Sequence, residues 1–200
     1  MLRDSTTTQL ATEALVERAK NGDRRAFEGL VDSYKDKVFL YVSRMLHDPE
    51  EAHDIAQETF VRAYQSLPGF RGASSFQTWL YRIASNLVID SVRRHRRRED
   101  SAVSLDAPVD TQEGQMGRDL ADDRRGPEAL AESSAVQHEV QRAIAKVTPK
   151  LRAVLVMYDI QGMSYQEIAE VLGCPLGTVK SRLFNARSQL KDLLEQRGVL

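Results

Sequence analysis

The chain has 200 residues, of which 42% are hydrophobic, and it carries 28 basic against 29 acidic side chains. This size permits one large hydrophobic core or two small ones. No apolar run of about 18 residues is present to cross a bilayer, and the Thr-rich start lacks the order of a secretory signal, so we expect a cytoplasmic protein without membrane insertion. One cysteine excludes an internal disulfide, and the histidines lack metal spacing, so we expect no metal or other cofactor.

The first half of the sequence predicts an N-terminal tail and the start of the first helix over 1–22, and then helices over 23–46, 48–67 and 76–96. Each predicted start has capping residues, namely Asp23, Asp48 before Pro49, and Ser74 or Ser75. Apolar residues recur at helical spacing, and no alternating run is long enough to predict a strand. We therefore predict an all-α fold.

A dense arginine block ends the third predicted helix, at Arg93, Arg94, Arg96, Arg97 and Arg98. Helical periodicity then disappears over 99–126, where Asp, Gly and Ser accumulate. Such a segment has too little apolar surface to offset its ordering entropy, so we predict an acidic flexible linker over 99–132. Helices resume after Pro127 and at Thr148, followed by helices over 165–172 and 175–196. The chain is thus two small helical domains, 23–98 and 133–197, joined by a linker.

The last two predicted helices have the spacing of a helix-turn-helix. Ser164 and Glu167 form a capping box, and Gly173 stands where a left-handed residue ends a helix. Pro175 suits the first position of the next helix. The alternative is a helical hairpin with a solvated basic face, which does not require this glycine, proline and capping pattern.

Three positions together meet the steric demands of that motif. Ala169 is small enough for the helix crossing, Gly173 allows the turn, and Val179 is a branched apolar residue beneath the second helix. We interpret Cys174 as a small turn residue. Amide, hydroxyl and cationic side chains, the types that read base edges and hold phosphates, cover the opposite face at Thr178, Lys180, Ser181, Arg182, Asn185 and Arg187.

The predicted helix over 48–67 has an acidic face with an apolar centre. Its inward positions are Ala52, Ile55, Ala56, Ala63 and Leu67, whereas Asp54, Gln57, Glu58 and Val61 share another face. Such a face is either a partner surface or simply solvated.

The next helix combines aromatic side chains with Arg and Asn. Its predicted core stripe is Phe76, Leu80, Ile83, Ala84 and Leu87, with Trp79 at the border and Tyr81, Arg82, Ser85, Asn86 and Ile89 off the core. Stacking groups beside an arginine block favour binding of unpaired bases, with charge holding the backbone. The alternative is that the aromatics are core-edge residues and the arginines a solvated helix end.

Two long stretches resemble one family. The stretch DPEEAHDIAQETFVRAYQSLPGFRGASSFQTWLYRIASNLVIDSVRRHRRR is similar to region 2 of bacterial extracytoplasmic-function sigma factors. The stretch MSYQEIAEVLGCPLGTVKSRLFNARSQLKDLL is similar to region 4 of that family. The resemblance implies a promoter-specificity factor, not an enzyme, that binds core RNA polymerase, opens promoter DNA and is held inactive by an anti-sigma factor.

The resemblance also implies roles for particular residues. Docking on the clamp helices of the largest polymerase subunit would use Asp54, Gln57, Glu58 and Val61. Melting the −10 element and capturing a flipped base would use Phe70, Arg71, Ser75, Trp79, Tyr81, Arg82 and Asn86, and we add Arg93, Arg94 and Arg97 as contacts to the DNA backbone. Reading the duplex −35 element would use Thr178, Lys180, Ser181, Phe184 and Asn185, with Arg182 and Arg187 nearer the phosphates. Asn185 replaces an arginine found in some members.

Two other classes remain as alternatives. A conventional helix-turn-helix regulator would bind duplex DNA by itself but would leave the region near Trp79 without a role. A nucleic-acid enzyme would need converging carboxylates or a Gly-rich phosphate loop, and neither pattern is present. The acidic linker is either a passive tether or a mimic of nucleic acid in a basic channel of polymerase.

Overall fold

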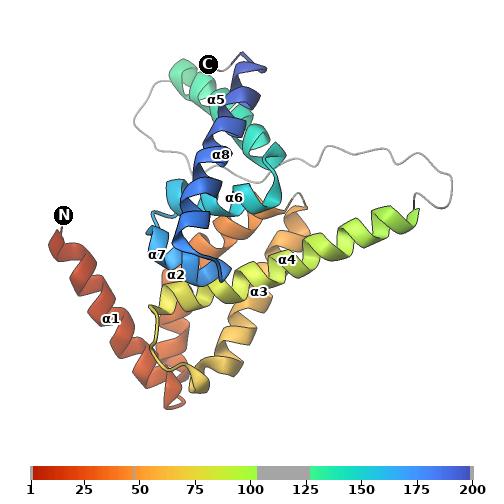
Figure 1. Ribbon diagram of the computed structural model, residues 1–200. Coiled ribbons are helices and arrows are strands. Elements are labelled where there is room, and N and C mark those ends of the chain that lie inside the picture. The colour runs from red at the N-terminus through yellow and green to blue at the C-terminus, as the bar shows by residue number, and fades with distance from the viewer. Residues whose placement is uncertain (1, 47, 103–126, 199–200) are drawn as a thin grey trace.

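The computed structural model describes residues 2–46, 48–102 and 127–198, and all its regular elements are helical, which confirms the all-α prediction (Figure 1). An N-terminal unit contains α1 (Leu2–Lys20), α2 (Arg24–Met45), α3 (Pro49–Ser66), the short η1 (Leu67–Gly69) and α4 (Phe76–Ala102). A C-terminal unit contains α5 (Pro127–Lys146), α6 (Pro149–Leu155), the single π-helical turn η2 (Val156–Ile160), α7 (Tyr165–Leu172) and α8 (Leu176–Glu195). No described helix is both long and apolar enough to cross a membrane.

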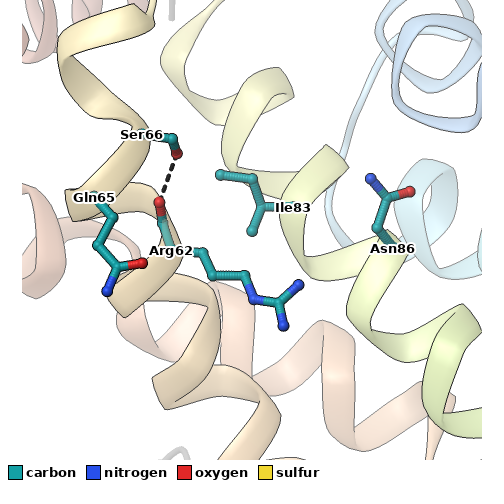
Figure 2. A pocket seen from close by; sticks show the side chains of 5 residues that line it. All are labelled: Arg62, Gln65, Ser66, Ile83 and Asn86. Atoms are coloured by element: carbon teal, nitrogen blue, oxygen red, sulfur yellow. Dashed lines mark hydrogen bonds between the residues drawn. The ribbon is translucent and has the colours of Figure 1, made fainter.

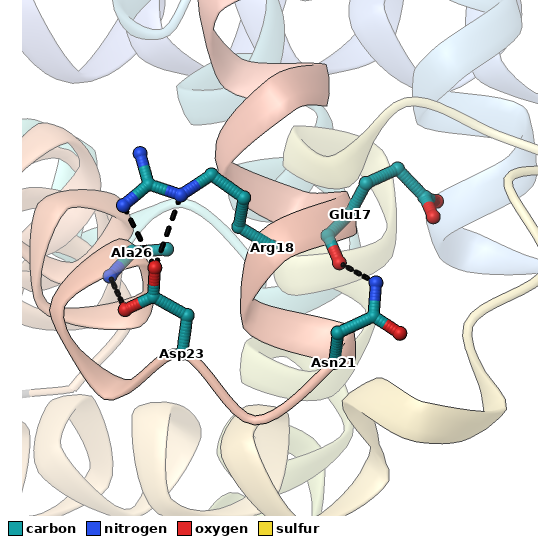
Figure 3. Close-up of polar contacts among 5 residues, drawn as sticks. All are labelled: Glu17, Arg18, Asn21, Asp23 and Ala26. Carbon is teal, nitrogen blue, oxygen red and sulfur yellow. Dashed lines mark hydrogen bonds and ion pairs between the residues drawn. The ribbon is translucent and has the colours of Figure 1, made fainter.

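Side-chain caps fix several helix starts as predicted. The Asp23 carboxylate accepts a hydrogen bond from the backbone amide of Ala26 at 3.1 Å, and Arg18 of α1 binds its other oxygen at 2.7 Å (Figure 3). This ion pair lowers the pKa of Asp23. Asp48 accepts from the amide of Glu50, which closes the first turn of α3.

The N-terminal segment, expected as a tail with the start of a helix, is helical over most of its length. Residues Leu2–Lys20 form α1, which packs against α2 and buries Val16 and Ala19. The predicted linker is also helical at both ends, since α4 continues to Ala102 and α5 begins at Pro127. The remainder of that prediction, 103–126, lies outside the described residues.

The inward residues predicted for α3 and α4 are buried, except Ile83, which is partly buried. The buried face of α4 also includes residues beyond those predicted. Tyr81 and Ser85, which we expected off the core, are 0% and 1% exposed. The hydroxyl of Ser85 hydrogen-bonds that of Tyr41 on α2 at 2.9 Å. The face widens because α4 packs against α2 and α3 and also against α7 of the C-terminal unit.

The two units therefore do not stand apart. Helix α7 packs on α4, while α2 contacts α5, α6 and η2 (Figure 1). Buried apolar residues of both units belong to one continuous cluster. This packing places α7 of the C-terminal unit against α4, the helix that carries Trp79.

Candidate nucleic-acid interface

The acidic face of α3 is accessible. Asp54 and Gln57 are exposed, Glu58 is partly exposed, and Val61 is 48% exposed at its centre. Glu58 accepts a hydrogen bond from Arg62 Nε at 2.7 Å, and Gln57 contacts the ring of His53. The face is therefore polar at its rim and apolar at its centre, as partner surfaces are.

A second feature, which we call the aromatic–arginine cavity, lies where the loop after η1 meets α4. It has a volume of about 430 Å³. Phe70 and Trp79 have ring centroids 5.0 Å apart, and both rings are partly buried. The lining consists of Gly69, Phe70, Arg71, Ala73, Ser74, Trp79, Arg82 and, from α7, Glu170.

A third feature, the Asn86 cavity, lies between α3 and α4 and has a volume of about 460 Å³. Its lining is Arg62, Gln65 and Ser66 on α3 and Ile83 and Asn86 on α4. Figure 2 shows the Arg62 side chain extending from α3 across the space between the helices, with Ile83 and Asn86 on the α4 side. The cavity thus combines an apolar wall with amide and guanidinium hydrogen-bonding groups.

The other predicted residues near these cavities have different positions. Ser75 is exposed, but its hydroxyl accepts a hydrogen bond from the amide of Thr78 at 3.1 Å and so caps the start of α4. Tyr81 lies inside the core, where burial raises the pKa of its phenol. Its hydroxyl lies 2.7 Å from Gln161 Oε1. The expectation that Tyr81 lies off the core is therefore wrong.

The arginine block continues α4 as helix. Arg93, Arg94 and Arg97 are exposed, and Arg93 lies 3.9 Å from Asp90. Earlier on the same helix, Ser91 donates a hydrogen bond to Glu51 of α3, and His95 lies 3.4 Å from the same carboxylate. These contacts fasten α4 to α3 at Ser91, before the arginine block, and at His95, within it.

The helix-turn-helix has the local geometry that the sequence predicts. Ser164 and Glu167 form both bonds of the capping box, and Gly173 has a φ of 59°, in the left-handed region. Val179 is fully buried beneath α8. Pro175 is the N-cap residue of α8 instead of its first helical residue, a shift of one position.

The outer face of α8 is open to solvent. Phe184 is 75% exposed, and Lys180, Ser181 and Asn185 are exposed around it. Thr178 and Arg182 are half-buried at the side, where Arg182 lies 3.8 Å from the sulfur of Cys174. An exposed phenyl ring beside amide, hydroxyl and ammonium groups suits contact with base edges and thymine methyl groups.

Arg187 is tied to its own domain. Its Nε donates to Asp159 Oδ2 at 3.1 Å, its Nη2 donates to the other oxygen, and its guanidinium lies 5.4 Å from the centre of the Tyr158 ring. Tyr158 stacks on Tyr165 with ring planes 11° apart. The carboxylate raises the pKa of Arg187. This side chain is therefore already paired with an acidic residue of its own domain.

Several lining residues were not predicted from the sequence. Arg62, Gln65 and Glu170 have no motif that marks them, because they join the cavities only through packing of helices distant in sequence. Asp159 could have been noticed as an acid before the helix-turn-helix, but its pairing with Arg187 spans 28 positions. Among the described residues, no group of three or more His, Cys, Asp or Glu side chains is arranged to hold a metal ion.

The fold and these surfaces define an all-α nucleic-acid-binding protein with a helix-turn-helix, and comparisons with known proteins identify the family. Residues 30–98 match the model of Sigma-70 region 2, and residues 137–190 match that of Sigma-70 region 4. The chain is 40% identical to the RNA polymerase sigma-H factor of Pseudomonas aeruginosa, with 94% of this chain and 96% of that protein covered. It is 41% identical to the ECF RNA polymerase sigma factor SigW of Bacillus subtilis, with 90% and 94% covered.

A solved structure shares the fold. The sigma factor RpoE of Bartonella quintana, in complex with the anti-sigma factor NepR, matches with a TM-score of 0.64 at 22% identity over 84% of this chain and 96% of that chain. The chain belongs to the extracytoplasmic-function sigma factors of the sigma-70 family. It is therefore a transcription initiation factor of bacterial RNA polymerase and not an enzyme.

Proposed function

We propose that this sigma factor divides promoter opening among three surfaces: a docking face on α3, a strand-holding region around α4 and a duplex-reading face on α8. The factor makes and breaks no bond. It supplies binding energy that positions polymerase and holds extruded bases. We assign it to the cytoplasm, where it would meet polymerase and DNA.

The docking face consists of Asp54, Gln57, Glu58 and Val61, and it would bind the clamp helices of the largest polymerase subunit. Its support is the accessible Val61 within a polar rim. The ion pair between Glu58 and Arg62 leaves part of the rim neutral. We expect Val61 to contribute most of the binding energy because burying it removes apolar surface from water.

The Asn86 cavity would receive a base flipped from the −10 element. The lining of this cavity supports the proposal, because it combines the apolar side chain of Ile83 with the amide of Asn86 and the guanidinium of Arg62. An amide offers a donor and an acceptor to the edge of a base, and unstacking a base costs a few kcal/mol that such contacts must offset.

The aromatic–arginine cavity would hold the neighbouring part of the melted strand. Phe70 and Trp79 present ring surface for stacking, while Arg71 and Arg82 supply charge for phosphates. Ser75 supports this site by capping α4. We assign the phosphates further along the strand to Arg93, Arg94 and Arg97, which are exposed on the last turns of α4.

The outer face of α8 would read the duplex −35 element. Lys180, Ser181, Phe184 and Asn185 are the base-reading candidates because they surround the exposed ring. Thr178 and Arg182 flank them as backbone contacts. We give Arg187 a supporting part, since Asp159 already binds it.

An anti-sigma factor is the expected inhibitor. The support is the likeness in fold to a sigma factor that was solved with its anti-sigma factor NepR. The inhibitor for this chain would cover the docking face and the α4 cavities, because these are the surfaces that polymerase and the melted strand need.

Transcription in vitro with purified core polymerase on a genomic promoter library tests the proposal. We expect transcripts from a subset of promoters, and loss of those transcripts when Val61→Glu places a charge at the centre of the docking face. A chain that yields no transcripts with core polymerase and binds duplex DNA by itself would instead be the conventional regulator.

A further inference from the structure

The cations in the first half of α8 lie on its two flanks. Lys180 lies on one flank, with its ammonium 5.9 Å from the centre of the Tyr165 ring. Arg187 shares that flank, since residues seven apart lie on one helix face, and its guanidinium is 5.4 Å from the centre of the Tyr158 ring. Arg182 lies on the opposite flank, beside the turn that precedes α8. Between the flanks, an uncharged crest faces solvent and consists of Ser181, Phe184, Asn185 and Ser188.

The amide of Asn185 is the one group on this crest that offers a donor and an acceptor in a fixed plane. Its side chain is exposed and makes no hydrogen bond or ring contact with the residues that the structure describes. The Ser181 hydroxyl, by contrast, donates to the carbonyl of Thr178 at 3.1 Å, so only its lone pairs remain for a ligand. Phe184 offers no conventional hydrogen bond. A base pair that meets the crest therefore finds both hydrogen-bonding groups of one amide available.

A planar amide matches the major-groove edge of one base only. Adenine presents the acceptor N7 beside the donor N6–H₂, so Nδ2 of Asn185 can donate to N7 while Oδ1 accepts from N6. Guanine presents two acceptors, N7 and O6, so Oδ1 would face a lone pair. Cytosine offers a donor alone, and thymine offers an acceptor beside a methyl group. Adenine is therefore the base that satisfies both atoms of the amide.

We propose that Asn185 is the specificity-determining residue for one base pair of the −35 element and that it selects adenine there. This inference rests on the proposed function of the outer face of α8 and adds what one position of that face reads. A guanidinium at the same position would present donors only and would suit the two acceptors of guanine. One substitution on the crest should therefore exchange one base preference for another.

Transcription from a pool of promoters tests the assignment. One genomic promoter that the full-length chain transcribes with core polymerase is rebuilt with all sequences of its upstream element, and sequencing of the transcripts gives the preference among the four bases at each position. Comparing bases within a position removes any uniform change in affinity for DNA. The variants are Asn185→Ala, Asn185→Arg and Asn185→Gln, which should fold like the natural chain because this side chain is exposed and has no partner among the described residues.

We expect the natural chain to favour adenine by about tenfold at one position, because a bidentate contact to a base discriminates by roughly that factor or more. Asn185→Ala should reduce this preference to about threefold or less, and Asn185→Arg should replace it with a preference for guanine. Asn185→Gln keeps the amide and should keep adenine. Gln137→Ala, which removes an exposed amide from α5, should leave all preferences unchanged.

Two results would overturn the inference. One is a set of base preferences that is the same in the natural chain and in Asn185→Arg. The other is a loss of transcription in Asn185→Ala that is equal for all upstream sequences, which would make Asn185 a contact to the DNA backbone.

Phe184→Ala separates such a failure from failure of the proposed function. If Phe184→Ala leaves transcription of all upstream sequences unchanged, or if no promoter is transcribed at all, the outer face of α8 does not read the element and both proposals fail. If Phe184→Ala weakens the dependence on the upstream element while the Asn185 variants keep the natural preferences, the duplex-reading face stands and only the role of Asn185 fails.

Discussion

The two DNA-facing regions of this chain differ in accessibility. The outer face of α8 is convex and open, with Phe184 75% exposed, whereas the aromatic–arginine cavity is concave and shares its lining with Glu170 of the other unit. Duplex DNA presents its base edges in the groove, so a helix face can read it without rearrangement. Unpaired bases exist only after melting. A region that binds them gains from being covered until then.

The largest effect is expected from a substitution in the aromatic–arginine cavity. Trp79→Ala should reduce open-complex formation by about tenfold or more, because stacking on an aromatic ring contributes about 1–3 kcal/mol per base. Binding to duplex −35 DNA should stay the same. Permanganate footprinting measures the melted bases, and Trp79→Phe, which keeps a ring, is the matched control. A bubble of normal extent in the alanine variant would contradict the role of Trp79.

On the α8 side, two cations should behave differently. Arg182→Gln should lower the slope of log affinity against log salt by about 1, as expected when a phosphate contact is lost. Arg187→Gln should change that slope less and lower the melting temperature, because Asp159 already binds Arg187. Duplex binding across a salt series, with thermal unfolding of both variants, measures this difference. Equal slope changes would make Arg187 a phosphate contact.

A smaller effect is expected at the turn between α1 and α2, distant from both DNA-facing regions. Asp23→Asn keeps an N-cap acceptor but removes the ion pair with Arg18. Because the folded chain lowers the pKa of Asp23, its contribution is present above the ordinary value of 3.8 and is lost as pH falls through the folded pKa. The natural chain should be more stable than the variant at neutral pH, and the two should converge in acid. A difference in stability between the two chains that persists in acid would contradict the role of the ion pair.

Features that depend on local spacing could be predicted from the sequence. The caps at Asp23 and Asp48, the capping box at Ser164 and the left-handed Gly173 each depend on residues within one turn, and each is confirmed. The inward face of α3 follows from its period of 3.6 residues and is likewise buried.

Features that depend on packing between distant segments could not be predicted. The spacing within α4 alone predicts that Tyr81 faces outward, but its hydroxyl donates a hydrogen bond to Gln161, which lies 80 positions later in the sequence. The Asn86 cavity lies between α3 and α4, and the aromatic–arginine cavity lies between the loop after η1, α4 and α7. No local sequence pattern therefore marks Arg62 or Glu170 as lining residues. The extent of α1 had no comparable local signal, because that helix is held by its packing on α2.

The distance between the two units tests the contrast between the open α8 face and the covered cavity most directly. A dye on the natural Cys174, in the turn before α8, and a second dye on Glu28→Cys in α2 report that distance by single-molecule energy transfer. We expect one high-transfer population in the free chain and a shift to low transfer when core polymerase binds. A free chain with low transfer, or a polymerase-bound chain that keeps high transfer, would contradict the account.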